Sequence, residues 1–427
     1  MSSNKVWTAT SIRELARERL KKSQPTAAPA NLASALPQDS SDDFTFQWGR
    51  FQEASGSRGY LVVPRNRAVR GSELEIRQLC ETLGLSCPEV IVVGSSQRPN
   101  SATYVGSGSL TEIAQRMKEL ECTVLVIDAD LSPAQIRNVE KIIEGPVLDR
   151  QGVILGIFQR HAQSNLAQMQ VELASLKYLL PRLTGIWSGL SRQRGAAGGL
   201  GGRAGGETRL ELDRRVIKQR ITSLNKKLKV AETTLKTQSA RREGLPRAVL
   251  IGYTNAGKSM LMRALTHAQV EADSRLFSTL DTTVRPLVPP TEPRILLSDT
   301  VGFVRDLPHN LIASFKSTLR EAFAGSLLLH VLDVSSDDAM EQFVTTEKVL
   351  EEIGAESIPR ILVANKIDKL QPGRRRVLDE ISRLIKERPV YLDQCAVSAL
   401  KGEGLSELKS QLISILKVKM PKWSELS

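Results

Sequence analysis

The 427-residue sequence contains little that would support a metal site, a disulfide framework or a membrane span. Its four cysteines and four histidines do not occur at the spacing of metal ligands. The longest apolar stretch, SLLLHVLDV from Ser326, is far shorter than the roughly 18 residues that cross a bilayer. No secretory leader is recognisable at the start of the sequence. These absences favour a folded cytoplasmic protein with reduced cysteines and no membrane span.

Acidic residues are fewer than basic ones, at 47 against 59, which gives a formal net charge of +12. This excess favours a polyanionic partner, although it can serve solubility alone. The Gly-rich segment RQRGAAGGLGGRAGGETR, residues 192–209, carries four arginines. A helical pattern follows it with the basic residues Arg214, Arg215, Lys218, Arg220, Lys226, Lys227 and Lys229. Alone, such a run indicates a solvated helix face; beside the Gly/Arg segment, it favours binding to a phosphate backbone.

The pattern of apolar and polar residues changes along the chain and predicts several structurally different parts. Residues 1–58 are rich in Pro, Ala and Ser without a sustained apolar period, which indicates a flexible tail. Over residues 59–157, short β-branched runs alternate with helical patterns, which predicts a small α/β domain with a parallel sheet. Leucines at steps of three and four predict a long antiparallel two-helix hairpin with a Gly-rich tip over residues 158–244. Pro181 is expected to kink or end its first helix.

An apolar strand from Arg247 leads into a phosphate-binding motif, GYTNAGKS. The glycines of such a loop let backbone N–H groups face the phosphates. Lys258 is expected to reach the β- and γ-phosphates, and the Ser259 hydroxyl to bind Mg²⁺. The predicted nucleotide-contacting residues of the loop are Gly252, Tyr253, Thr254, Asn255, Ala256, Gly257, Lys258 and Ser259.

Two further motifs follow at the ends of apolar strands. In SDTVGF, Asp299 is expected to hold the metal through water, and the Gly302 N–H to sense the γ-phosphate. In NKID, the Asp368 carboxylate can accept from both N1–H and the 2-amino group of guanine, a pairing that adenine cannot supply. Asn365 would brace the loop, and Lys366 would pack on the base. Ser398, Ala399 and Leu400 follow at a spacing where a backbone N–H could meet the guanine O6.

The motif order predicts an α/β protein in which residues 245–420 form a P-loop GTPase domain with a mostly parallel sheet, followed by a short C-terminal end at residues 421–427. The small α/β domain and the two-helix hairpin precede this domain. The expected substrate is GTP, and the expected cofactor is Mg²⁺. Only the NKID motif distinguishes GTP from ATP, which leaves ATP as an alternative substrate.

The sequence closely resembles the HflX family of GTPases, relatives of the Obg group. The resemblance rests on GYTNAGKS, FSTLDTT, SDTVGF and NKID together with TYVGSGSLTEI, LSPAQIRNVEK, DRQGVILGIFQRHA, LLPRLTGIWSGLSRQRG and GETRLELDRR. It covers nearly everything from residue 59 to about 420. It implies a GTPase that binds the large ribosomal subunit through its N-terminal and helical domains and dissociates ribosomes under stress. The basic hairpin and its tip would then reach ribosomal RNA.

The resemblance also assigns residues in the segment LFSTLDTT. The threonine that completes the Mg²⁺ shell falls on Thr279, with Thr282 or Thr283 as rivals, and Phe277 joins the nucleotide-contacting set. The expected metal ligands are thus Ser259, Thr279 and Asp299, and the residues expected to serve catalysis are Lys258, Thr279 and Gly302. The Gly-rich tip departs from the family's usual pattern because it is longer and lacks the proline.

Phe303 stands where Ras-like switches keep a glutamine that orients the attacking water. Because phenylalanine cannot orient water by hydrogen bonding, intrinsic hydrolysis is expected to be slow and to be stimulated on a large partner. The alternative is that Phe303 packs switch II while a nearby polar residue does this work. Arg305 and His309 are the nearby candidates.

Three functions are compatible with these features. The first is a ribosome-splitting or large-subunit-binding GTPase, acting as a monomer. The second is a GTPase used in assembly of the large subunit. The third is an RNA-binding adaptor whose nucleotide domain binds without hydrolysing, a reading that the intact Lys258, Ser259 and Asp299 disfavour.

Overall fold

The structure is a computed structural model, and it describes residues 57–65, 67, 71–93, 99–184, 209–240, 245–267, 276–277, 283–307, 311, 319, 323, 326–370 and 375–423. All of these residues belong to one unit of the chain, Glu53–Ser427. The tail predicted for residues 1–58 lies outside the described residues except for its last two positions.

A four-stranded parallel sheet forms the N-terminal part, in the order β2-β1-β3-β4. Its strands are β1 (Gly59–Pro64), β2 (Val90–Val93), β3 (Val124–Ile127) and β4 (Val147–Asp149). The central strand β1 is buried at every position, as its continuous apolar run predicts. Each parallel connection carries a helix, namely α3 (Ser72–Leu83), α4 (Ser107–Glu119) and α5 (Pro133–Ile143).

The helix α6 (Arg150–His161) follows β4 directly. The Asp149 side chain accepts from the Gly152 N–H and so caps the helix. Seven consecutive residues from Gly152 to Phe158 are buried, so this helix has no polar face along most of its length. The limit expected at residue 157 falls inside α6.

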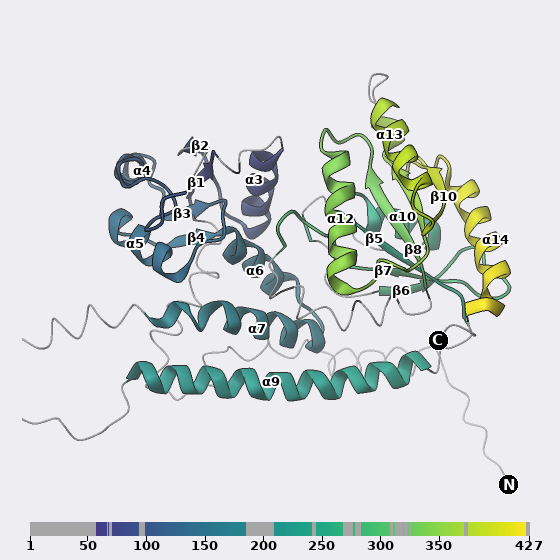
Figure 1. The fold of residues 1–427 in the computed structure, drawn as a ribbon, viewed down its shortest axis with the longest axis horizontal. Coiled ribbons are helices and arrows are strands. Elements are labelled where there is room, and N and C mark those ends of the chain that lie inside the picture. The colour runs from purple at the N-terminus through teal and green to yellow at the C-terminus, as the bar shows by residue number, and fades with distance from the viewer. Residues whose placement is uncertain are drawn as a thin grey trace, which may run out of the picture. The chain divides into compact units, whose positions relative to one another are not determined.

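Two helices pair beside this sheet, α7 (Asn165–Leu179) and α9 (Arg209–Ala240), as Figure 1 shows. The first helix ends just before Pro181, which cannot continue a helix, and a short 3₁₀ turn η2 (Arg182–Thr184) follows. The second helix buries Ile217, Leu224 and Leu228, which repeat at steps of seven and four. The Gly-rich tip lies outside the described residues except for its last position, Arg209, which begins α9.

The C-terminal part contains a six-stranded sheet in the order β10-β9-β8-β5-β7-β6. Among the described strands of this sheet, β6 at the edge pairs antiparallel with β7, and the other neighbouring pairs are parallel. The strands are β5 (Arg247–Gly252), β6 (Thr283–Pro286), β7 (Leu296–Asp299), β8 (Ser326–Asp333), β9 (Arg360–Asn365) and β10 (Tyr391–Ala396). Because β5 lies between β7 and β8, the strand order reverses at β5, and ligands of open α/β sheets bind at the carboxyl end of such a reversal.

Helices cover both faces of this sheet (Figure 1). One hydrophobic cluster packs α10 (Lys258–Thr266) and α14 (Leu405–Trp423) on one face. Another packs α12 (Ala339–Ile353) and α13 (Arg375–Lys386) on the other. The expected fold class is thus confirmed: a P-loop α/β domain with a mostly parallel sheet, preceded by a small α/β domain and an antiparallel helical hairpin. Across the described residues, none of the helices has the length and hydrophobicity that a bilayer crossing needs.

Candidate nucleotide-binding site

The phosphate-binding motif forms the turn between β5 and α10. Strand β5 ends at Gly252, and α10 begins at Lys258, so the backbone of the loop lies at the amino end of a helix. Gly257 has φ +94, and a Cβ there would lie 2.3 Å from the Asn365 Nδ2. Glycine is therefore required where the phosphate loop touches the NKID segment.

Lys258 is buried, with 6% of its surface exposed, in the middle of this loop. Its ammonium donates to the Tyr253 carbonyl at 2.8 Å and to the Gly252 carbonyl at 3.2 Å. Burial lowers the pKa of the lysine to about 8, and the nearby Asp299 carboxylate opposes this shift. Among the described residues, the hydrogen bonds of this buried cation go to neutral carbonyls, so it is well placed to meet the negative charge of a phosphate.

Two of the expected metal ligands meet beside the lysine. The Ser259 hydroxyl donates to the Asp299 carboxylate at 2.8 Å. Asp299 ends strand β7 with 1% of its surface exposed, and its other oxygen accepts from the Thr300 N–H. A hydroxyl and a carboxylate are hard oxygen donors, the kind that Mg²⁺ takes while keeping several waters. The donor set therefore fits Mg²⁺.

The segment after Asp299 is tied to the phosphate loop by its backbone. The Phe303 N–H donates to the Gly252 carbonyl at 3.0 Å, and the Thr254 N–H donates to the Phe303 carbonyl at 2.6 Å. A Cβ at Gly302 would lie 2.8 Å from the Thr254 Cα and 2.9 Å from the Lys258 Nζ, so only glycine fits. The Phe303 side chain is buried, with 1% of its surface exposed. It therefore packs inside the protein in this structure.

The NKID segment braces the phosphate loop. The Asn365 amide donates to the Ala256 carbonyl at 2.8 Å and accepts from the Ala399 N–H at 3.0 Å. The Lys366 ammonium donates to the Asn255 carbonyl at 2.7 Å and pairs with Asp333 at the same distance. Asn365 thus joins the loop to the segment around Ala399.

Asp368 lies at the surface beside the segment that contains Ser398 and Leu400. The Ser398 hydroxyl donates to the Asp368 carboxylate at 2.7 Å, and this hydrogen bond lowers the pKa of Asp368. Ser398 is fully buried, whereas Leu400 is exposed. The Asp368 carboxylate is therefore ionised at neutral pH and is held in one orientation with its surface open to a ligand.

The switch I residues are only partly described. Thr279 and its rival Thr282 lie outside the described residues. The other rival, Thr283, begins β6 and pairs with Asp299 across the sheet. Phe277 is buried with φ +58, and its ring packs edge-on against Phe158 of α6 at 4.7 Å. This side chain therefore contacts the N-terminal part of the chain.

A buried polar network, which the sequence does not reveal, joins the phosphate loop to the N-terminal part. The Tyr253 hydroxyl donates to Glu75 of α3 at 2.6 Å and accepts from the Arg305 N–H at 2.8 Å. The Arg150 guanidinium, on α6, donates to the Arg305 carbonyl at 3.0 and 3.2 Å. It also pairs with Glu75, and with Asp128 at 2.8 Å. The Arg305 N–H is thus bonded to the phosphate loop, and the Arg305 carbonyl is bonded to the N-terminal part.

Electrostatics favour the charged form of Arg150 and the protonated form of Tyr253. Burial opposes the charge on Arg150, but the carboxylates of Glu75 and Asp128 outweigh it and raise the pKa of the arginine above its ordinary value. Burial raises the pKa of Tyr253, and the charge of Glu75 raises it further, so the phenol stays protonated and donates. The Arg305 side chain donates to Glu341 at 2.7 Å, and His309 lies outside the described residues.

Replacing Arg150 by glutamine is expected to destabilise the protein. Arg150 has 1% of its surface exposed, and its loss would leave the Glu75 and Asp128 carboxylates buried without their cation. Breaking a buried ion pair in this way costs about 3–5 kcal/mol. Thermal unfolding should therefore begin at a lower temperature, and amide exchange at residue 305 should become faster. The exposed Arg383 serves as the control, since Arg383→Gln should change stability by less than about 0.5 kcal/mol. Equal unfolding of both variants would contradict this account.

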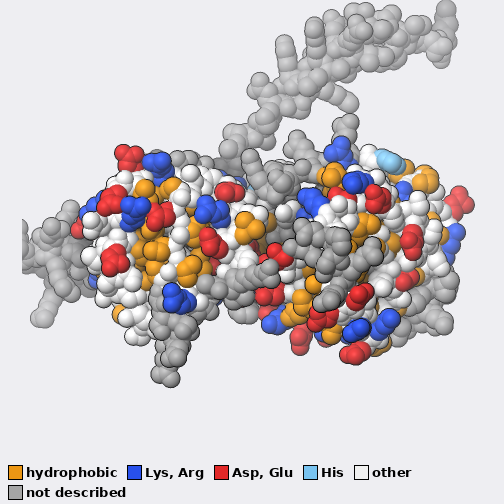
Figure 2. All heavy atoms as spheres, turned by 90° about the horizontal axis from the view of Figure 1, so that it is seen from above, with side chains coloured by type: hydrophobic (Ala, Val, Ile, Leu, Met, Phe, Trp, Pro, Cys, Tyr) orange, Lys and Arg blue, Asp and Glu red, His pale blue; other side chains and the backbone are white. Residues whose placement is uncertain are grey.

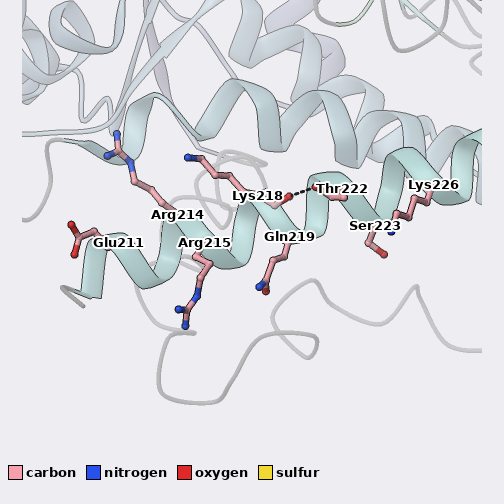
Figure 3. Close-up of a pocket in the computed structure, with 8 residues that line it drawn as sticks. All are labelled: Glu211, Arg214, Arg215, Lys218, Gln219, Thr222, Ser223 and Lys226. Atoms are coloured by element: carbon pink, nitrogen blue, oxygen red, sulfur yellow. Dashed lines mark hydrogen bonds between the residues drawn. The ribbon is translucent and has the colours of Figure 1, made fainter. Parts of the chain in front are cut away.

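A second candidate surface is the basic face of α9. A hollow of about 650 Å³ runs along this helix, and Figure 3 shows its lining side chains. In that view, Arg215 and Gln219 point away from the neighbouring helix. The bidentate pair of Arg220 with Glu172, at 2.6 and 3.0 Å, ties α9 to α7. The lining residues are Glu211, Arg214, Arg215, Lys218, Gln219, Thr222, Ser223 and Lys226.

This surface differs from the face drawn in Figure 2, where acidic and basic side chains are interspersed. Lys218, Lys226, Lys227 and Lys229 are all exposed. One acidic residue, Glu211, lines the hollow together with four basic ones. A groove in which basic side chains outnumber acidic ones attracts a polyanion such as a phosphate backbone.

Comparison with known proteins shows to which class of protein this nucleotide-binding site belongs. Residues 71–159, 161–242 and 247–366 match, in turn, the families described as GTP-binding GTPase N-terminal, GTP-binding GTPase Middle Region and 50S ribosome-binding GTPase. A crystal structure of SsGBP in complex with GDP superposes with a TM-score of 0.51 at 26% identity, covering 85% of this chain and 99% of that one. Together with the converging motifs, these matches define a P-loop GTPase.

Curated relatives narrow this class. The chain is 44% identical to GTPase HflX of Magnetococcus marinus over 79% of its own length and 76% of the relative. It is 40% identical to GTPase HflX of Escherichia coli over 78% of its length and 76% of that relative. The match to GTPase HflX of Gluconacetobacter diazotrophicus, at 46% identity, covers 69% of this chain and 62% of that relative. The chain belongs to the HflX family of GTPases, and the resemblance seen in the motifs is confirmed.

Proposed function

We propose that the chain is a cytoplasmic GTPase that binds the large ribosomal subunit and its RNA, dissociates ribosomes under stress, and hydrolyses GTP faster on that partner. The N-terminal α/β domain and the helical hairpin would provide the docking surfaces. The observation that carries the proposal is the exposed basic face of α9, beside a domain in which three nucleotide-binding segments converge. The match of residues 247–366 to a family described as 50S ribosome-binding GTPase supports ribosomal RNA as the polyanion that this face binds.

Within the nucleotide site, each residue receives a role that its surroundings support. Lys258 binds the β- and γ-phosphates, and the Gly302 N–H senses the γ-phosphate beside it. Ser259 and Asp299 hold Mg²⁺, which when bound neutralises charge on the phosphate oxygens. Asp368, ionised and oriented by Ser398, accepts from guanine. Because GTP and ATP differ only in the base, Asp368 favours GTP over ATP.

Sedimentation with purified ribosomes and separated subunits tests the proposal. The protein is mixed with either GDP or a non-hydrolysable GTP analogue before centrifugation. Analogue-dependent migration with the large subunit, together with loss of intact ribosomes, is the expected result. If the protein migrates with ribosomes in neither nucleotide state, the ribosomal role is wrong. Migration without loss of intact ribosomes would remove the splitting role and leave the large subunit as the partner.

Neutralising the basic face of α9 is expected to weaken binding to the large subunit. It should also make the binding affinity less dependent on the salt concentration. Each lost phosphate contact reduces the slope of log affinity against log salt by roughly 0.7 to 0.9. The double change Lys218→Gln and Lys226→Gln should therefore flatten this slope by about 1.5. Co-sedimentation over a series of salt concentrations provides the measurement.

A matched control removes the same charge elsewhere. Lys348 on α12 and Lys386 on α13 are exposed lysines of the nucleotide-binding domain, away from α9. Their double change to glutamine lowers the net charge equally but leaves the groove intact. If the control variant loses binding as strongly as the α9 variant, net charge rather than the α9 face carries the attraction.

A further inference from the structure

This inference rests on the proposed function, namely that the phosphate loop and the NKID segment together bind GTP. Within that segment, Lys366 is expected to pack on the guanine base. A lysine side chain has several rotatable bonds, so holding it in one position costs conformational entropy. A base therefore binds more tightly if another group already holds the lysine in place.

The structure holds Lys366 both at its backbone and at its ammonium. The backbone has φ +65, a left-handed conformation that residues other than glycine keep only where their surroundings impose it. The ammonium donates to the Asn255 carbonyl at 2.7 Å and lies 2.7 Å from a carboxylate oxygen of Asp333. The stem lies against the phosphate loop, since a Cβ at Gly257 would be 4.0 Å from the Lys366 Cε. Asp333 is thus the anionic partner that meets the end of this lysine.

Asp333 is itself held in one orientation. It is the last residue of β8 and lies beside Asn365 of β9 in the sheet. One of its carboxylate oxygens accepts from the N–H and the hydroxyl of Ser335, at 2.9 and 2.6 Å. The other oxygen pairs with Lys366. The two oxygens therefore have separate partners, and the turn after β8 aims the free charge of the carboxylate at the lysine.

The surroundings of the pair between Asp333 and Lys366 make it suitable as an anchor. The Asp333 side chain has 15% of its surface exposed, and the Lys366 side chain 21%. Partly buried charges are screened by salt much less than exposed ones. A hydrogen bond between two charged groups is also stronger than one between neutral groups. None of the nucleotide-binding motifs contains Asp333, so the sequence did not single it out.

We propose that Asp333 is a positioning residue for nucleotide binding, and that it fixes the Lys366 ammonium so that the lysine stem is held in place for the guanine base to pack on. Asp333 acts through Lys366 and is assigned no contact of its own with the nucleotide. GTP and GDP carry the same base, so both gain affinity equally from Asp333. The chemical step at the γ-phosphate does not depend on it.

Replacing Asp333 by asparagine in the full-length protein tests this role. Asparagine carries no charge and offers one acceptor oxygen in place of two, so it cannot serve both Ser335 and Lys366. Affinities for GDP and for a non-hydrolysable GTP analogue should both fall about fivefold to thirtyfold. Titration with fluorescent nucleotides measures them. The single-turnover rate of GTP hydrolysis at saturating protein should stay at the native value. Asp379→Asn on α13 removes the same charge from an exposed position and should bind both nucleotides as the native protein does.

A double-mutant cycle shows whether Asp333 acts through Lys366. Lys366→Met removes the ammonium but keeps an unbranched stem. Adding Asp333→Asn to this variant should cause no further loss of nucleotide affinity, because the pair is already broken. A merely structural role of Asp333 would instead add its full loss to that of Lys366→Met, and this result overturns the inference.

Two other results also contradict the inference. One is native affinity for GDP in Asp333→Asn, and the other is a lower rate of hydrolysis in that variant without a loss of affinity. Absence of guanine-nucleotide binding by the native protein overturns the proposed function itself.

Discussion

Replacing Lys258 by alanine is expected to abolish useful binding of GTP and GDP. The lysine is buried at the centre of the phosphate loop, and its ammonium donates to the carbonyls of Gly252 and Tyr253. Bound phosphates would provide the negative charge that these carbonyls lack. Truncating one partner of such a buried, hydrogen-bonded charge pair costs about 2–5 kcal/mol, which is a loss of about thirtyfold to several thousandfold in affinity.

Titration with a fluorescent guanine nucleotide measures this loss directly. Lys348→Ala is the matched control, since Lys348 is an exposed lysine on α12 of the same domain. Thermal unfolding of the nucleotide-free proteins shows whether the fold is retained. Unchanged affinity in Lys258→Ala would refute the assignment of residues 252–259 as the phosphate-binding loop.

The fold could be read largely from the sequence where one face of an element is buried and the other is not. The stripe through Ile217, Leu224 and Leu228 predicts α9 because the opposite face of that helix is polar and basic. In contrast, α6 gives no periodic signal, because its residues from Gly152 to Phe158 are all buried. A helix that is apolar all round cannot be told from a buried strand by period alone.

In the nucleotide site, too, some features are visible in the sequence and others depend on tertiary packing. Each motif carries its own local signal, and the reversal of strand order at β5 brings their separate loops together. No such signal exists for the network of Glu75, Arg150 and Tyr253, because Tyr253 is 178 positions from Glu75 and the contact depends on tertiary packing. Thr279 stays a prediction because it lies outside the described residues.

For Phe303, the chemistry of the side chain and its packing in the structure give different information. Its chemistry alone excludes a water-orienting hydrogen bond. Its packing adds that the side chain lies in the interior, while the backbone of Phe303 bridges Gly252 and Thr254. The segment following Gly302 is therefore bonded to the phosphate loop through its backbone, and through Arg305 it also contacts Arg150 of the N-terminal part.

Replacing Asp368 by asparagine is expected to shift base preference from guanine toward xanthine. The Asp368 carboxylate accepts from two donors on guanine, N1–H and the 2-amino group. An asparagine amide turns one of these acceptors into a donor, which then faces the 2-amino group of guanine, whereas xanthine carries an oxygen acceptor at that position. Losing one hydrogen bond to a charged group costs about 1.5–3 kcal/mol, so the affinity for GTP should fall roughly tenfold to a hundredfold.

Competition between GTP, XTP and ATP for the native protein and the variant provides the measurement. Affinity for XTP should rise as affinity for GTP falls, while affinity for ATP stays low in both proteins. Asp379→Asn is the matched control, because Asp379 is an exposed aspartate on α13 and removing it changes net charge by the same amount. The hydrogen bond from Ser398 can also be made to an amide oxygen, so the loop should keep its conformation in the variant. An unchanged ratio of GTP to XTP affinity would remove Asp368 from base recognition and leave guanine selection to the backbone near Ala399.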